Sequence, residues 1–386
     1  MRLSSLKAAV RCGIVLILLS GFLTSACSTD KLDLENASVP LALGLDLDEN
    51  QKIHYYLSTP VFNHDIKKKS KEIDAEFLSL RQSRKDQDSM VSGSIQGRNY
   101  QVLLIGRKLI ETEGWFQMLD VIYRDPRNTV TDRVIVVQGP VSDVIYFRAD
   151  DQPPISVFLR SLIDSKSKNA ETVRTTAQEL HRQYFDRALT PAVSEIKLEE
   201  GRVKVTGTAL LSHLGLYRTS LGRQETALLE ILQGNGRPGL MLSYAIPGEK
   251  KTGPFATDRL SFTLGVIKTK IKSSYSNDKF HFQIKIKAIV NVMEELFPYN
   301  MLSQEYHLER QVEQQMKGQI ESMLSKIQRQ QIDPVGFGLY ARAYQHDEFK
   351  KVQNDWGKAL AKADFDVKVS IKIGTMGAIS NVSDIN

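Results

Sequence analysis

The sequence has 386 residues, 41% of them hydrophobic, and carries 51 Lys and Arg against 45 Asp and Glu, which gives a formal net charge of +6. Its length exceeds what one hydrophobic core usually organises, so we expect two or three domains. The charges are too nearly balanced for a nucleic-acid-binding protein, whose basic surface would dominate the composition.

The first 27 residues have the pattern of a lipoprotein signal peptide. A basic head precedes an apolar run, beginning at Gly13, that is too short to span a bilayer, and the small residues Ser25 and Ala26 stand directly before Cys27. We therefore predict that residues 1–26 are removed and that the thiol of Cys27 takes a diacylglyceryl group and its fatty acyl chains, such as palmitate. The alternatives are an ordinary cleaved signal with an incidental cysteine and a short N-terminal membrane helix.

Removal of this signal changes what the mature chain can do. Cys12 is lost, so Cys27 is the single remaining thiol, which excludes disulfides and thiolate metal sites. Three basic residues and no acidic ones are lost as well, which leaves 48 Lys and Arg against 45 acids. No second apolar run of about 18 residues follows. We expect a soluble body that its N-terminus holds to the extracytoplasmic face of the cell membrane.

The region after the cysteine begins with a polar tether, residues 28–36, which reaches at most about 30 Å. Alternating apolar residues on either side of residues 48–50 predict a β-hairpin. We interpret the lysines at 67–69 and 71 as the solvated start of a helix, with a membrane-facing role as the alternative. That helix would place Ile73, Phe77 and Leu80 on one face.

Two continuous apolar runs, 100–105 and 130–138, predict strands that are buried on both faces. Helices are expected between them, up to residue 113 and again over 115–123, and after them near 156–163 and 170–187. The order strand, helix, helix, strand predicts an α/β region over residues 27–190, in one or two subdomains.

The pattern changes at Leu189–Pro191 from mostly helical to mostly extended, so we place a boundary there and assign residues 191–386 to a C-terminal α+β domain. The expected elements are a hairpin around 199–201, a helix at 224–232, alternating strands at 260–266 and 280–286, a long helix at 303–331, helices between Asp333 and Leu360 with Trp356 in the core, a strand at 364–373, and a frayed tail at 379–386. The predicted fold is a mixed α/β, α+β multi-domain ectodomain whose C-terminal domain is a mostly antiparallel sheet covered by a long helix.

Several short stretches occur in an order that matches one known family along nearly the whole mature chain. They are Cys27 with the acidic segment after it, 42–46, 103–106, 123–126, 207–209, Asp333 with 336–338, 354–356 and 365–373. Together they resemble the Ger(x)C spore germination lipoproteins, the C subunits of GerA-type nutrient germinant receptors. The sequence departs from that family at Ser28, where tryptophan is common, and at Leu210 or Leu211, where phenylalanine is frequent.

The resemblance implies a three-domain α/β ectodomain that is anchored by lipid on Cys27 to the spore inner membrane. It also implies association with two integral-membrane receptor subunits, and that nutrients such as amino acids or sugars trigger germination through the complex. The family offers no catalytic residue to transfer.

The residues themselves give no pattern for catalysis. No Gly-x-Ser-x-Gly elbow occurs, and the glycine-rich loop 234–239 lacks the Lys-Ser/Thr of a phosphate loop. Adjacent acids such as those at 150–151, 199–200 and 294–295 do not face each other in a strand or a helix. None of the histidines has the i, i+3 or i+4 spacing of helical metal ligands: His54, His64, His181, His213, His281, His307 and His346. We therefore expect no enzyme, no cofactor and no metal.

Two other classes of protein remain as alternatives to a receptor subunit. One is a lipid-anchored extracytoplasmic solute-binding protein, and the other is an extracytoplasmic enzyme without a recognisable motif. A solute-binding protein would usually show two similar α/β lobes, whereas residues 191–386 are extended and then helical. The sequence favours a non-catalytic receptor subunit.

Overall fold

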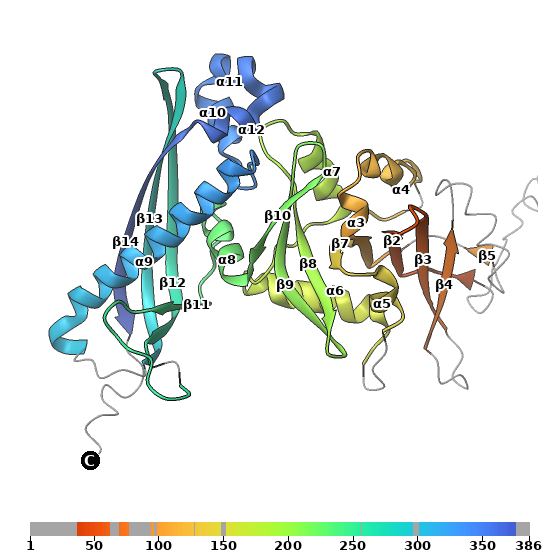
Figure 1. Ribbon diagram of the computed structural model, residues 1–386, viewed down its shortest axis with the longest axis horizontal. Coiled ribbons are helices and arrows are strands. Elements are labelled where there is room, and N and C mark those ends of the chain that lie inside the picture. The colour runs from red at the N-terminus through yellow and green to blue at the C-terminus, as the bar shows by residue number, and fades with distance from the viewer. Residues whose placement is uncertain are drawn as a thin grey trace, which may run out of the picture.

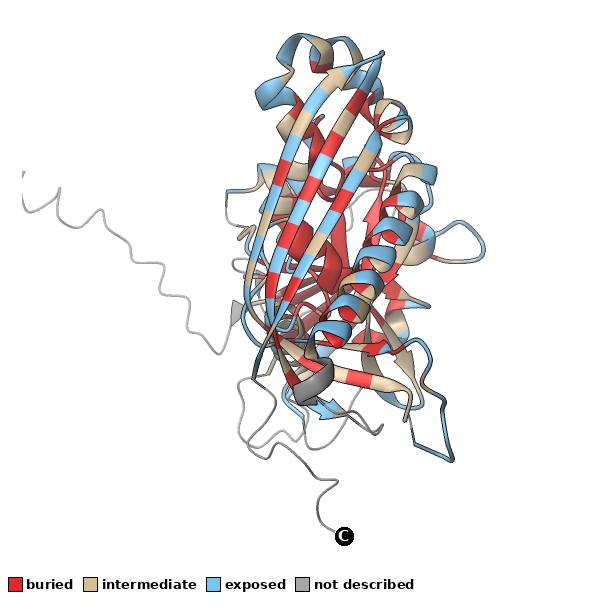
Figure 2. Ribbon diagram, turned by 90° about the vertical axis from the view of Figure 1, so that its left-hand side faces the viewer, coloured by how far each residue is buried: buried red, intermediate tan, exposed pale blue. Residues whose placement is uncertain are grey.

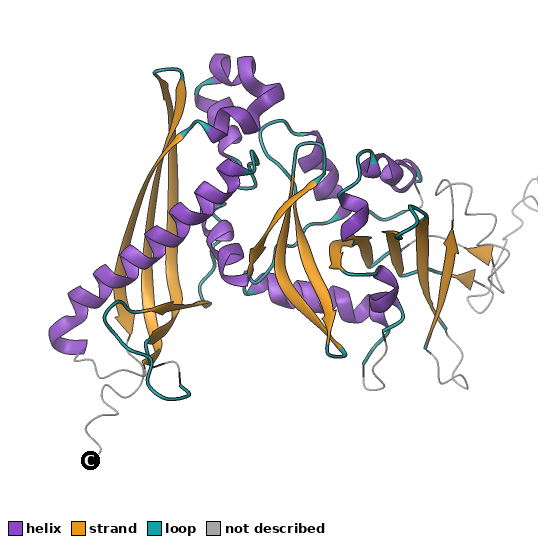
Figure 3. Ribbon diagram, in the orientation of Figure 1, coloured by secondary structure: helices purple, strands orange, loops and turns teal. Residues whose placement is uncertain are grey.

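The computed structural model describes residues 37–61, 69–76, 94–95, 99–126, 128–147, 152–255, 257–295 and 301–375. The predicted signal peptide, Cys27, the tether and the predicted tail lie outside these residues. Two large sheets follow one another along the long axis of the molecule (Figures 1 and 3). A short parallel pair, β1 (Ala37–Ser38) and β5 (Ser94–Ile95), lies at the N-terminal end.

The first large sheet has eight strands in the order β10-β9-β8-β7-β6-β2-β3-β4. Its central strands β2, β6, β7 and β8 are parallel, and antiparallel strands complete the sheet at both ends. Their bounds are β2 Ala42–Leu47, β3 Ile53–Pro60, β4 Ser70–Glu76, β6 Val102–Gly106, β7 Arg133–Gln138, β8 Ala192–Glu199, β9 Arg202–Leu211 and β10 Tyr217–Gly222.

Helices cover both faces of this sheet, which explains the continuous apolar runs of β6 and β7. Leu103 and Ile105 of β6 pack on the core that contains residues of α3, η2, α4 and α7, whereas Val102 and Leu104 pack on α5 and α6. The predicted buried strands are thereby confirmed. The bounds of the helices are α3 Arg107–Ile110, η2 Trp115–Leu119, α4 Asp120–Arg124, α5 Val141–Ile145, α6 Ile155–Lys168 and α7 Ala177–Phe185.

The second large sheet has four strands, and helices cover one face of it. The order is β11 (Leu240–Ala245), β12 (Arg259–Ser276), β13 (Lys279–Glu295) and β14 (Asp364–Thr375), with β13 and β14 parallel and the other pairs antiparallel. The long α9 (Met301–Arg329) and α8 (Arg223–Leu232) pack on its buried face. The predicted antiparallel sheet under a long helix is confirmed, with one parallel strand at its edge.

The apolar stripe predicted for the long helix α9 is buried. No helix in the described part of the chain is both long and apolar enough to cross a membrane. At the edge of the sheet, side chains of α9 cover β14: Glu313 accepts a hydrogen bond from the backbone N–H of Ile371, and Glu309 accepts one from Ile373, both at 3.0 Å. The buried stripe is Leu308, Val312, Met316, Ile320, Met323, Leu324 and Ile327.

Four short helical segments lie between α9 and β14, at the end of the sheet where the β12–β13 hairpin turns (Figure 1). Phe349, Trp356 and Leu360 of these segments belong to the core of the second sheet, as predicted. The segments are α10 Phe337–Tyr344, α11 His346–Val352, η3 Gln353–Asp355 and α12 Trp356–Ala361.

The structure corrects two predicted helices. Ile73 lies in β4, an edge strand paired with β3, whereas Phe77 and Leu80 of the same predicted helix lie outside the described residues. The helix predicted over 170–187 begins at Ala177, because Thr172 and Thr175 instead donate side-chain hydrogen bonds to the carbonyls of strand residues Gly207 and Ala192. These tertiary hydrogen bonds hold the segment against β8 and β9 before the helix begins.

The predicted domain boundary between residues 190 and 191 falls within a continuous sheet. Strand β8 begins at Ala192 and pairs in parallel with β7, so β8, β9 and β10 extend the sheet of the preceding region. How the chain divides into independently folding units stays a prediction.

Candidate functional site

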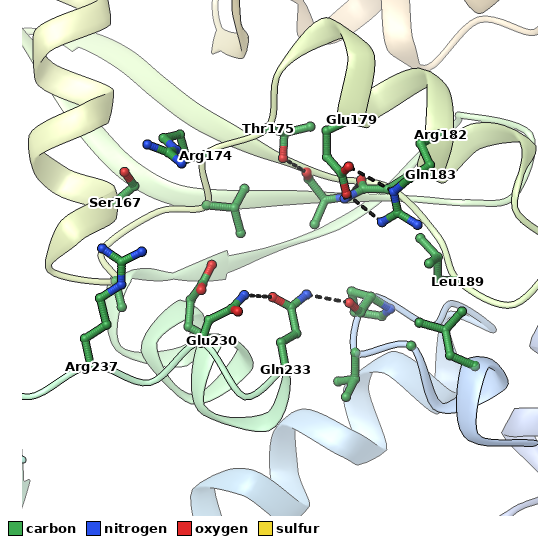
Figure 4. A pocket seen from close by; sticks show the side chains of 18 of the residues that line it. Ser167, Arg174, Thr175, Glu179, Arg182, Gln183, Leu189, Glu230, Gln233 and Arg237 are labelled. Carbon is green, nitrogen blue, oxygen red and sulfur yellow. Dashed lines mark hydrogen bonds and ion pairs between the residues drawn. The ribbon is translucent and has the colours of Figure 1, made fainter. Parts of the chain in front are cut away.

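A cavity of about 470 Å³ lies at the junction of the two sheets (Figure 4). Its walls come from the end of α6 and the segment that joins it to α7, from α7, from Leu189 and the start of β8, from the C-terminal end of α8 with the glycine-rich loop and Leu240, and from residues 334–339. Segments that are far apart in the sequence thus meet at one hollow.

Arginines give the cavity its positive charge. Arg174 and Arg237 line it from opposite segments, near one end of the view in Figure 4, and both side chains are exposed. Arg182 lines the other end, where its guanidinium donates to Glu179 at 2.6 and 2.9 Å. These hydrogen bonds lower the pKa of Glu179. The carboxylate of Glu179 is therefore the ion-pair partner of Arg182, whose charge it balances.

The pKa of a second carboxyl group in the cavity, that of Glu230, is shifted in the opposite direction. Burial raises the pKa of Glu230, while the side chain of Asn235 and the nearby Arg237 oppose that shift. A buried carboxyl group with a raised pKa beside an arginine is the kind of group found at ligand-binding sites.

The neutral polar side chains of the cavity make structural hydrogen bonds. Thr175 Oγ1 donates to the carbonyl of Ala192 at 2.6 Å, Gln233 Nε2 donates to the carbonyl of Pro334 at 2.8 Å, and Ser167 Oγ donates to the carbonyl of Asp164 at 3.2 Å. The bonds of Thr175 and Gln233 tie one wall of the cavity to another segment, whereas the bond of Ser167 stays within α6.

Asp333, next to the cavity wall, is fully buried and joins three segments. Its Oδ1 accepts from the backbone N–H groups of Gly336 and Phe337 at 2.8 and 3.0 Å, and its Oδ2 accepts from Gly338 N–H and Trp356 Nε1, both at 2.8 Å. Burial raises the pKa of Asp333, and these four donors oppose that shift by favouring the carboxylate. The helix α10 begins at Phe337 with Gly336 as its N-cap, and the Asp333 side chain accepts from the backbone N–H groups at this helix start.

Glycines make this tight turn possible. Gly336 adopts a left-handed conformation with φ 89°, and a Cβ on Gly338 would collide with the backbone of Ala188. The backbone of Asp333 also pairs with Thr190: the carbonyl accepts from Thr190 N–H at 2.9 Å and the N–H donates to Thr190 Oγ1 at 3.0 Å. Residues 186–190, the 333–338 turn and Trp356 are therefore one connected unit, which we call the Asp333 junction.

The residues singled out from the sequence do not meet at one site in the structure. Cys27 lies outside the described residues, so its lipidation stays a prediction. Of the histidines, His54 contacts Asp48 at 3.3 Å and Asp74 at 3.4 Å, and within the described ranges no group of three or more metal-ligating side chains forms. The loop 234–239, interpreted from the sequence as a plain loop, supplies Asn235 and Arg237 to the cavity.

Sequence reasoning did not find the cavity, because its lining residues carry no spacing signal. The Asp-Pro at 333–334 was a local sign of the Asp333 junction, but nothing in the sequence linked it to Thr190. Asp333 and Thr190 come together only through the packing of the two sheets.

Comparisons with known proteins agree along both halves of the chain. Residues 30–198 match the family described as spore germination protein N-terminal domain, and residues 206–377 match the family described as spore germination B3/GerAC like, C-terminal. The chain is similar to spore germination protein B3 of Bacillus subtilis (strain 168), with 24% identity over 366 residues, covering 91% of this chain and 94% of that protein. Its fold is similar to the crystal structure of the GerBC protein, with a TM-score of 0.58 and 19% identity over 86% of this chain and 96% of that one.

Proposed function

Because this chain belongs to the spore germination family of GerAC-like receptor C subunits, we propose that it is a non-catalytic, lipid-anchored subunit of a nutrient germinant receptor. In this proposal Cys27 carries the lipid and holds the body on the extracytoplasmic face of the spore inner membrane. Two integral-membrane subunits associate with it, and the complex converts a nutrient signal into germination.

The observation that carries the proposal is the agreement of both halves of the chain with the same family. The two family matches lie in order and together reach from residue 30 to residue 377. The similar Bacillus subtilis protein is named for spore germination, and 94% of its length is covered. A shared fold alone would not carry a function, but sequence similarity over the full length supports a shared role.

The chemistry of the cavity supports a non-catalytic role. Glu179 is held by Arg182, and Thr175, Gln233 and Ser167 donate to backbone carbonyls. A nucleophile needs a base within hydrogen-bond reach and a free position for the reacting atom. These four side chains of the cavity are instead engaged with Arg182 or with backbone carbonyls.

Replacement of Cys27 tests the anchor and the receptor role together. Spores that carry Cys27→Ala should lose the nutrient response that a deletion strain loses, while a germination route that bypasses receptors stays intact. In cells without the partner subunits, the variant should move from the membrane fraction to the soluble fraction, because one lipidated residue supplies the anchor. Cys27→Ala protein that remains fully in the membrane pellet under those conditions would contradict the lipid anchor.

The cavity gives a specific reason to keep a second candidate, a lipid-anchored solute-binding protein. Arg174, Arg237 and Glu230 could hold a small polar molecule that bears a carboxylate. Calorimetric titration of the purified chain with amino acids and sugars separates the two functions. Binding that Arg174→Ala and Arg237→Ala abolish, and that the exposed-site control Arg202→Ala leaves unchanged, would favour the second candidate.

A further inference from the structure

Lysines line the outer face of the four-stranded sheet, the face away from α8 and α9. Their side chains are exposed and alternate along β12 and β13 with buried apolar residues such as Ile271 and Ile284. Figure 2 views the molecule from the end at which this sheet lies, and the alternation of buried and exposed residues runs along its long strands. We call this surface the lysine face; its members are Lys268, Lys270, Lys272, Lys285, Lys287 and Lys368.

The register of the sheet places these lysines side by side. Lys268 is directly opposite Lys287, and Lys270 is directly opposite Lys285, which in turn is level with Lys368 on β14. Residues opposite each other in neighbouring strands have Cβ atoms roughly 5 Å apart, and like charges at that distance destabilise the sheet. Folding therefore gains nothing from this arrangement.

Carboxylates of the protein do little to neutralise the surface. Asp366 pairs with Lys368 at 3.3 Å, and Asp364 at the end of the sheet pairs with His281 at 3.3 Å. For the five members of the lysine face on β12 and β13, the ion pairs found among the described residues include no carboxylate within 4.0 Å. Repelling cations whose ion pairs are confined to β14, where Asp366 pairs with Lys368 and Glu309 pairs with Lys372, have the electrostatics of a binding surface for an anion.

Exposed apolar side chains continue the same face toward β11. Ile289, which is level with Lys372, is 40% exposed, Val266 at a bulge in β12 is 53% exposed, and Met241 of β11 is 64% exposed. A surface with a basic centre and an apolar end fits a ligand that has both carboxylates and apolar side chains. Polypeptides have both, whereas a polyphosphate would leave the apolar end uncovered.

From these observations we propose that the lysine face docks an acidic polypeptide segment of a partner protein. Lys268, Lys270 and Lys272 repeat every second residue along β12, so their side chains recur at about 7 Å. An extended peptide with Asp or Glu at every second position presents carboxylates with the same repeat. The face has lysines and no arginine, and bidentate recognition of phosphate relies on arginine.

An anionic bilayer fits the lysine face less well than a polypeptide does. The described chain begins at β1, and the four-stranded sheet lies at the opposite end of the molecule (Figure 1). A tether of residues 28–36 reaches at most about 30 Å. A bilayer that holds Cys27 would lie near β1 and away from the lysine face, although this one step depends on the proposed anchor.

Binding of a defined acidic peptide to the full chain in detergent tests the proposal. The probe is a fluorescent peptide of alternating Glu and Val, and its anisotropy is compared with that of an alternating Gln and Val peptide. We expect binding of the Glu peptide alone, and at least about tenfold weaker binding to the triple variant Lys268→Gln, Lys270→Gln, Lys285→Gln, because charge pairing across the interface is lost. The matched control Lys250→Gln, Lys251→Gln, Lys350→Gln removes the same charge from exposed sites elsewhere and should bind like the wild type.

Two further measurements separate the competing explanations. The triple variant should melt at the same or a higher temperature than the wild type, since the substitutions relieve repulsion, so weaker binding would not come from unfolding. Spores that carry the triple variant should lose nutrient-triggered germination at unchanged protein level, and spores with the control variant should keep it.

Three results would overturn the proposal. They are equal peptide affinity of the triple variant and the wild type, displacement of the peptide by phosphatidylglycerol vesicles or by polyphosphate at lower charge concentration than by unlabelled peptide, and normal germination of triple-variant spores. None of these results would contradict the receptor role itself, which the Cys27→Ala spores test separately.

Discussion

At the scale of single residues, Trp356 shows how packing and hydrogen bonding combine at the Asp333 junction. Its side chain is buried against Phe280 and Phe349, with ring centroids 5.1 and 5.3 Å away, and its indole N–H donates to Asp333. The sequence predicted a packing residue from the apolar stripe that Trp356 shares with Phe349 and Leu360. The hydrogen bond to a carboxylate is an additional role.

Two substitutions of Trp356 separate these roles. Trp356→Ala removes both and should lower the free energy of unfolding by about 3–5 kcal/mol. Trp356→Phe keeps most of the ring packing and removes one donor to a charged group, so about 1–3 kcal/mol is expected. Urea denaturation of the purified protein measures both, and a Trp356→Phe variant as stable as the wild type would refute the separate contribution of the hydrogen bond.

A second buried acid, Asp132 at the start of β7, makes stability depend on pH. Burial raises its pKa to about 7, and in the described part of the structure both carboxylate oxygens lack a hydrogen-bond partner. The pKa of an aspartate in an unfolded chain is about 4, so the folded protein holds this proton more tightly. The resulting stabilisation is complete below about pH 4 and is lost as pH rises through about 7.

Asp132→Asn should therefore remove part of the pH dependence of melting. We expect the wild type to lose several degrees of melting temperature relative to the variant between pH 5 and pH 8, because the amide cannot ionise. The exposed Asp143→Asn is the control and should follow the wild type. A melting-temperature difference between Asp132→Asn and wild type that does not change with pH would show that Asp132 does not titrate in this range.

At the scale of elements, the most accurate predictions concern elements whose pattern reflects their own burial. Strands β6 and β7 are apolar throughout because both faces are covered, and β12 and β13 alternate because one face is exposed. Strand β4 was mistaken for a helix since its pattern is weak and its pairing with β3 decides its conformation. Pairing partners of that kind are tertiary information.

The edge of β14 gives a prediction at this scale. Glu309 and Glu313 of α9 accept the outward N–H groups of Ile373 and Ile371, which would otherwise be free to pair with another chain. Glu309→Leu with Glu313→Leu should lower the melting temperature and cause oligomers in size-exclusion chromatography. Glu309→Gln with Glu313→Gln keeps an acceptor at each position and should stay monomeric, and a Leu variant that remained monomeric would contradict the edge role.

At the scale of the whole molecule, the Asp333 junction is one of the places where the two sheets are joined. Thr190 pairs with Asp333, and Arg342 of α10 pairs with Asp186 at 2.9 Å. These contacts link the segment that follows α7 to the turn before α10 and to α10 itself, which lies at one end of the second sheet.

The extent of the first folding unit can be tested with two fragments. A fragment of residues 28–190 lacks β8, β9 and β10 and exposes the edge of β7, so it should not unfold cooperatively, whereas 28–222 contains all eight strands and should. Thermal melts followed by circular dichroism measure both. A cooperative melt of 28–190 would instead support the boundary predicted from the sequence at residue 190.

The sequence by itself determined the elements whose signal is local: the buried strands, the β8–β9 hairpin, the amphipathic α9, the closing strand and the family resemblance in residue order. The tertiary structure decided the rest: the joining of β8 to β7, the cavity between Arg174 and Arg237, the pairing of Asp333 with Thr190, and the rows of lysines across three strands. The physical reason is that periodicity records the burial of a residue relative to its own element, whereas a site depends on the register and packing of elements distant in sequence, which leave no spacing signal in any single stretch.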